Sequence, residues 1–75
     1  MDYYEESRYS VMKFAESHGI NLSEIPVRLK EEIVHLFYKN YYNYEMDEEY
    51  AAPAAIREVI SENNIELEGF EKWVP

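Results

Sequence analysis

The chain has 75 residues, a formal net charge of −9 and no cysteine, which excludes disulfide bonds and thiolate metal sites. A chain this short is expected to form one domain over residues 1–75 and to bury only about 60% of the surface its unfolded form exposes. Its hydrophobic content of 47% separates it from disordered acidic tails. The negative charge disfavours direct binding to nucleic acids or anionic lipids, which would repel it, so binding to a protein is favoured over catalysis.

The beginning of the chain lacks the features of a secretory signal. Met1-Asp2-Tyr3-Tyr4-Glu5-Glu6 has neither the basic start nor the apolar run that such a signal needs. No uninterrupted apolar run of the sequence is long enough to span a membrane. We therefore expect a cytoplasmic protein, located in the cytoplasm of the host cell if the gene is viral.

The first predicted helix covers about Tyr3 to His18. Asp2 is placed to cap this helix, and Glu5 stands three residues later as its capping-box partner. Gly19 occupies the position where a left-handed residue often ends a helix, and Ile20 would make the accompanying hydrophobic contact. Helical spacing predicts an inward face composed of Tyr4, Ser7, Val11, Phe14, Ala15 and His18.

The second predicted helix covers about Glu24 to Lys39. Ser23 is its predicted cap, and Pro26 is tolerated within a first helical turn. Apolar and aromatic residues recur at spacings of three and four, which predicts an amphipathic helix. Its inward face would comprise Ile25, Leu29, Ile33, Leu36, Phe37 and Tyr41, with Leu22 joining the core just before it.

The stretch from residue 40 to residue 44 mixes Asn, a poor helix former, with Tyr, which favours strands. It is predicted to be irregular or a short helical segment. The third predicted helix starts between Asp47 and Pro53, with the proline at or near the first turn, and runs to about Asn63. Its main body would begin at Ala54, and its inward residues would be Ala52, Ala55, Ile56, Val59 and Ile60.

The end of the chain alternates apolar and acidic residues from Ile65 to Phe70. This period of two predicts an extended segment laid on the helices, where Trp73 and Val74 would also dock. The predicted fold is thus mainly α, a small bundle of three principal helices. A short fourth element near residues 41–49 and an extended C-terminal tail complete it.

The sequence offers little for catalysis or metal binding. Glu32 and His35 have a Glu-x-x-His spacing, but carboxylate di-metal bundles need two such pairs and two further carboxylates. Gly19 and Gly69 are far apart, so no glycine-rich loop is present to hold a phosphate. We expect no enzyme activity, no catalytic residue, no metal and no cofactor.

The negative charge is concentrated in three blocks of the sequence. Residues 1–10 carry −2, residues 41–50 carry −4 and residues 61–70 carry −3, while the remaining residues balance to zero. Seven of the eight tyrosines lie in the first two of these blocks. Tyrosine is enriched in protein interfaces, and carboxylates spaced along a surface can imitate the phosphates of a duplex. The predicted partner-binding residues are Tyr41, Tyr42, Tyr44, Glu45, Asp47, Glu48, Glu49 and Tyr50, with Asp2, Glu5 and Glu6 as secondary contacts.

This pattern favours a small acidic inhibitor that mimics nucleic acid. Its partner would be a basic protein, such as a nucleic-acid-binding complex or a nuclease, and it would bind neither nucleic acid nor membranes itself. Size and charge suggest by analogy a phage-encoded anti-CRISPR or anti-restriction protein. Two alternatives remain open: a toxin-neutralising immunity protein or antitoxin, and a module that forms homodimers through its tyrosines without any mimicry.

The C-terminal half is similar to the immunity proteins of DNase colicins. Tyr41-Tyr42, Asp47-Glu48-Glu49 and Pro53-Ala54-Ala55-Ile56 stand in the order found in that family: a tyrosine pair, an acidic stretch and a helix that opens with proline. The residues between these motifs differ, and the proline after the tyrosine pair is absent. The resemblance implies a four-helix fold and an inhibitory surface built from tyrosines and carboxylates.

Overall fold

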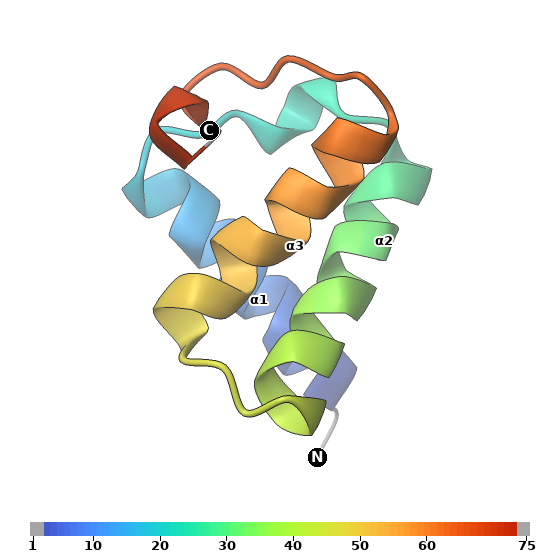
Figure 1. Ribbon diagram of the computed structural model, residues 1–75, viewed down its shortest axis with the longest axis vertical. Coiled ribbons are helices and arrows are strands. Elements are labelled where there is room, and N and C mark those ends of the chain that lie inside the picture. The colour runs from blue at the N-terminus through green and yellow to red at the C-terminus, as the bar shows by residue number, and fades with distance from the viewer. Residues whose placement is uncertain (1–2, 74–75) are drawn as a thin grey trace.

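The computed structural model describes residues 3–73, and over this range the chain is a small all-α bundle, as predicted. Figure 1 shows its three α-helices, α1 (Tyr3–Ser17), α2 (Val27–Tyr38) and α3 (Glu48–Glu62). The connections contain three short helical segments: η1 (Leu22–Glu24) and η3 (Glu71–Trp73) are 3₁₀ turns, and η2 (Lys39–Asn43) is a π-helical turn. No strand occurs between residues 3 and 73.

The core lies where α2 packs against both α1 and α3. Most residues predicted to face inward are buried in this core, while Phe14 and Leu36 are half-buried against it. His18 and Tyr41 were also predicted to face inward, but both are exposed. His18 follows the last residue of α1, and Tyr41 lies in the wider π turn, so neither side chain continues the stripe of its helix. Five residues outside the predicted inward faces are also buried, namely Val34, Ala51, Pro53, Leu67 and Phe70.

Helix α1 ends one residue before the predicted His18. The amide of Ile20 donates to the carbonyl of Ala15 at 2.8 Å, and Gly19 has a φ of +68°. This is the expected stop, in which glycine takes the left-handed position and the following apolar residue is buried. The predicted cap, Asp2, lies outside the described residues.

Helix α2 begins three residues later than predicted, and Ser23 is not its cap. Instead, the Asn21 side chain accepts a hydrogen bond from the Ser23 amide and caps η1. Ile25 is extended, with φ −92° and ψ 134°, because a residue before proline is sterically disfavoured in the helical region. Pro26 is therefore the N-cap residue of α2 and not part of its first turn.

Helix α2 continues into the π turn η2, which is the short helical segment predicted after Lys39. The amide of Tyr44 donates to the carbonyl of Lys39 at 3.0 Å, a bond that spans five residues and widens the helix. Glu45 then adopts a left-handed conformation with φ 55°, and the chain turns toward α3.

Helix α3 begins at Glu48, within the predicted range, but Pro53 is not in its first turn. Pro53 is buried in the interior of the helix. The prediction that the body begins at Ala54 was therefore wrong. Because proline has no amide hydrogen, the helical bond to the Glu49 carbonyl is missing, while Ala51, Ala52 and Ala55 still pack with no exposed surface.

The C-terminal segment lies on the bundle, as predicted. Leu67 and Phe70 are buried, and Ile65 and Trp73 pack against the core, whereas Val74 lies outside the described residues. Gly69 passes so close to the end of α1 that a Cβ atom built on it would lie 2.4 Å from the carbonyl oxygen of Gly19. This approach of the C-terminal segment to the end of α1 requires glycine at position 69.

Candidate functional site

The structure brings the acidic residues of α1 together with the tyrosines after α2. Glu5, Glu6 and Tyr9 face Tyr41, Tyr42 and Glu48 across a hollow of about 460 Å³, here called the tyrosine hollow. Figure 1 shows why: the N-terminal end of α1 and the C-terminal end of α2 lie side by side at the bottom of the molecule. Among the described residues, those that line this hollow include three carboxylates and no Lys or Arg.

Tyr42 joins the two sides of the tyrosine hollow. Its hydroxyl donates a hydrogen bond to Oε2 of Glu6 at 3.2 Å, and its ring lies 5.0 Å from that of Tyr3 and 5.1 Å from that of Tyr38. Partial burial, together with the hydrogen bond to the Glu6 carboxylate, raises the pKa of the Tyr42 phenol. The phenol therefore stays protonated and remains a donor at neutral pH.

The π turn gives the neighbouring tyrosines their positions. The Tyr41 ring stacks on the buried Phe37 with 5.7 Å between ring centroids, and it meets the Tyr42 ring edge-on at 4.9 Å. The Asn40 side-chain amide donates to the Ala51 carbonyl at 3.3 Å, which ties the π turn to α3. These contacts hold the tyrosine hollow against the core.

Two further acidic residues of the block formed by residues 41–50 lie on the other side of the first turn of α3. Asp47, Glu49 and Tyr50 line a second hollow of about 840 Å³ between α1 and α3, here called the aromatic hollow. Neighbouring helical residues point in different directions, so Glu48 and Glu49 face different hollows. The wall opposite these residues includes Phe14 from α1, His18 directly after α1, and Trp73 from η3.

The aromatic hollow has a packed aromatic wall. The ring centroid of His18 lies 4.6 Å from that of Phe14, to which it is tilted, and 4.9 Å from that of Trp73. The Trp73 ring meets both of these rings edge-on. Nε of Arg57 donates to the backbone carbonyl of Trp73 at 2.8 Å. This bond holds the C-terminal turn η3 against α3.

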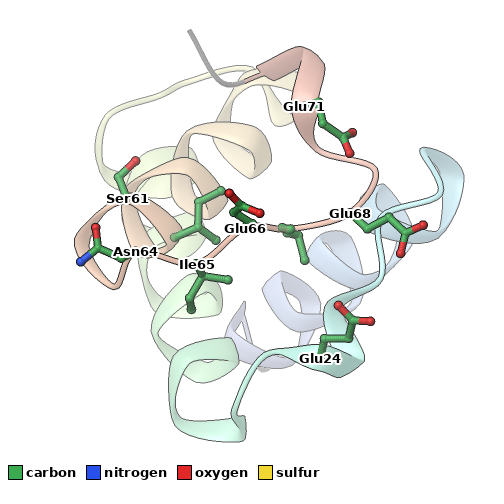
Figure 2. A pocket seen from close by; sticks show the side chains of 9 residues that line it. Glu24, Ser61, Asn64, Ile65, Glu66, Glu68 and Glu71 are labelled. Carbon is green, nitrogen blue, oxygen red and sulfur yellow. The ribbon is translucent and has the colours of Figure 1, made fainter.

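The third acidic block lies at the opposite end of the molecule, above the top of α3 in Figure 1. Glu66 and Glu68 line a separate hollow together with Glu24 and Glu71 (Figure 2), and their carboxylates spread around its rim. The longest dimension of the molecule is 33 Å, whereas charges in physiological salt are screened over about 8 Å. The third block therefore adds little to the potential at the tyrosine hollow.

The predicted partner-binding residues thus separate into groups. The tyrosine hollow contains Tyr41, Tyr42, Glu48, Glu5 and Glu6, and the aromatic hollow contains Asp47, Glu49 and Tyr50. Tyr44 and Glu45 are exposed and line neither, and Asp2 lies outside the described residues.

Sequence reasoning missed several residues of these hollows. Tyr9 lies four residues after Glu5, so helical spacing alone could have placed it on the same face. Phe14 and His18 were predicted to share a face and Trp73 to dock on the helices, but only the path of the C-terminal segment places the Trp73 ring against these two rings.

The histidines show no arrangement for metal binding. His18 and His35 are exposed and belong to different parts of the chain, and Glu32 is exposed as well. Over residues 3–73, no three His, Asp or Glu side chains are placed to hold a metal ion together. In the same range, no helix combines the length and apolar character needed to cross a membrane.

No family model, curated protein or solved structure matches this chain significantly.

Proposed function

We propose that this protein is a stoichiometric inhibitor that binds a basic, nucleic-acid-handling protein and occupies the groove where that protein holds nucleic acid. The binding surface would be the tyrosine hollow together with the acidic first turn of α3. A phage-encoded anti-CRISPR or anti-restriction protein is the biological setting that fits this chemistry.

The observation that carries the proposal is the meeting of two acidic, tyrosine-rich segments that are far apart in sequence. Glu5 and Glu6 come from α1, whereas Tyr41 and Tyr42 come from η2 and Glu48 is the first residue of α3. A charge excess needed only for solubility would not require tyrosines and carboxylates to gather around one hollow. Their gathering supports a contact surface.

The chemistry of this surface is complementary to a nucleic-acid-binding groove. Such a groove presents Arg and Lys side chains that pair with phosphates, and carboxylates can take the place of those phosphates. Aromatic rings such as the exposed Tyr9 and Tyr41 offer flat faces for the side chains that stack on bases. Because exposed carboxylates steer association, binding should be fast and sensitive to salt.

The proposal can be tested with the protein as bait in a nuclease-treated bacterial lysate, at low and high salt. We expect capture of a nucleic-acid-binding protein that duplex DNA displaces and that high salt releases. Capture of nothing, or of a partner that DNA does not displace, would contradict the proposal. Self-association that persists at high salt, with no other partner, would instead favour the homodimeric module.

A pair of charge-matched variants sharpens this experiment. E45Q/D47N/E48Q/E49Q removes four charges beside the two hollows, and E24Q/E62Q/E66Q/E68Q removes four elsewhere. The first variant should weaken capture at least about tenfold and the second by less than about twofold, because only nearby charges act on the partner. If both variants lost capture equally, binding would depend on the net charge of the protein and not on the position of its acidic residues. Circular dichroism of both variants controls for folding.

A further inference from the structure

The aromatic hollow contains three kinds of group that together recognise one kind of side chain. It has aromatic rings, the carboxylates of the N-cap residue Asp47 and of Glu49 at the start of α3, and an apolar wall formed by Met46, Pro53 and Ala54. Aromatic faces attract cations, carboxylates pair with them, and apolar walls accept the aliphatic stem of a long basic side chain.

The charge of the hollow favours a cation. Asp47 and Glu49 are both exposed, and Asp47 makes no capping hydrogen bond with its side chain. Arg57 is the only Lys or Arg among the described residues that line the hollow, and its Nε is bonded to the Trp73 carbonyl. The two carboxylates outnumber Arg57, the one cation among the described lining residues, while Lys72 lies on the Trp73 ring without lining the hollow.

The aromatic groups are suitably placed for a further cation. Tyr50 is 69% exposed and lies three residues after Asp47, so its ring and that carboxylate are on the same side of α3. The wall behind them already accepts a cation from its own chain, since Nζ of Lys72 lies 4.5 Å from the ring centroid of Trp73. A guest cation on Tyr50 would lie beside the Asp47 carboxylate and in the same hollow as the aromatic wall.

We infer that the aromatic hollow receives an arginine side chain from a basic segment of the partner protein. Arginine fits better than lysine, because its planar guanidinium stacks on aromatic rings, pairs with a carboxylate through two hydrogen bonds and is weakly hydrated. The inference rests on the proposed function in assuming a basic partner, and it adds the side chain by which that partner is anchored.

A peptide titration tests the inference without the partner. The probe is a peptide of alternating glycine and arginine residues, and the control is the same peptide with citrulline, which keeps the shape of arginine but has no charge. Trp73 is the only tryptophan of the chain and lines the hollow, so its fluorescence reports occupancy directly. We expect a saturable change with the arginine peptide, weaker binding by the lysine peptide and none by the citrulline peptide.

Matched variants locate the bound side chain. Tyr50→Ala should weaken the arginine peptide about five- to tenfold, as expected for a lost cation–π contact, whereas Tyr44→Ala should change it by less than about twofold. Both tyrosines are exposed and belong to the same acidic block, but only Tyr50 lines the hollow. D47N/E49Q should likewise weaken binding more than E66Q/E68Q, which removes the same charge at the opposite end of the molecule.

The inference is overturned if the arginine peptide gives no saturable change, if the citrulline peptide binds equally well, or if Tyr44→Ala weakens binding as much as Tyr50→Ala. These outcomes are separate from those of the lysate capture. Failure of capture with successful peptide binding would remove the proposed function and leave the arginine site. The reverse result would leave the inhibitor proposal supported by the tyrosine hollow alone.

Discussion

At the scale of single residues, the ion pair between Arg8 and Glu31 connects α1 to α2. The guanidinium forms two hydrogen bonds to the carboxylate, from Nη1 to Oε2 and from Nη2 to Oε1, the second at 2.8 Å. The hydroxyl of Tyr4 also donates to the backbone carbonyl of Glu31. The hydrogen bond from Arg8 lowers the pKa of the Glu31 carboxyl below its ordinary value.

This lowered pKa predicts a loss of stability in acid. A carboxyl whose pKa is lower in the folded state contributes stability above its ordinary pKa of 4.5, and that contribution disappears as the pH falls through the folded-state value. Glu31→Gln should therefore reduce the free energy of unfolding at neutral pH, and its difference from the wild type should shrink below about pH 4.5. Urea denaturation at several pH values measures both effects.

Glu32→Gln is the matched control, because Glu32 is the adjacent, exposed carboxylate. The free energy of unfolding of this variant should differ little from that of the wild type at every pH. A Glu31 variant that behaves like the Glu32 variant would show that the ion pair contributes nothing measurable to stability.

At the scale of the elements, the C-terminal segment depends on the two glycines where it crosses α1. Gly19 and Gly69 both have positive φ values, +68° and +89°, but their surroundings differ. A Cβ on Gly19 would meet no atom within 4 Å, whereas a Cβ on Gly69 would collide with the backbone of Gly19. The first position needs glycine for its conformation, and the second also needs it for space.

The two alanine variants should therefore differ in stability. Gly19→Ala should cost about 1–2 kcal/mol, the usual penalty for a left-handed L-residue. Gly69→Ala should cost about 3 kcal/mol or more, because the clash adds to the backbone strain. Denaturant unfolding compares them, and Trp73 fluorescence should report that η3 is displaced only in the Gly69 variant. Equal costs would contradict this prediction, because they would mean that the C-terminal segment moves away from Gly19 without any further loss of stability.

At the scale of the whole molecule, the charge of −9 acts in two ways. Two acidic blocks meet around the tyrosine hollow and the first turn of α3, and the third lies at the other end of the bundle. The concentrated charge can steer a basic partner, but the total charge also repels itself and opposes the compact state.

Added salt should consequently stabilise the free protein while weakening its complex. Raising sodium chloride from about 0.01 M to 1 M shortens the screening length from about 30 Å to 3 Å. If this relieves about 1 kcal/mol of repulsion, the midpoint of thermal unfolding should rise by about 4–8 °C. Circular dichroism measures the midpoint, and the E45Q/D47N/E48Q/E49Q variant should show a smaller rise. A lower midpoint in high salt would contradict the self-repulsion.

The sequence by itself determined the fold class, the end of α1 and most of the core, because these depend on local spacing and on residues such as Gly19. It did not determine the start of α2, where the effect of Pro26 on Ile25 outweighed the cap at Ser23. It also misplaced Pro53, since burial of the alanine-rich face keeps α3 helical on both sides of the proline.

Only the tertiary structure decided how the acidic residues are grouped. The sequence located three blocks but carried no information on their distances, because contacts between distant segments follow from helix packing and not from local preference. The packing of α1 beside the end of α2 allows the hydrogen bond between Tyr42 and Glu6. The path of the C-terminal segment places Trp73 in the same hollow as Tyr50. Most of the net charge of −9 therefore lies in two places. One is an acidic and aromatic surface that is divided between two hollows, and the other is a separate acidic end of the molecule.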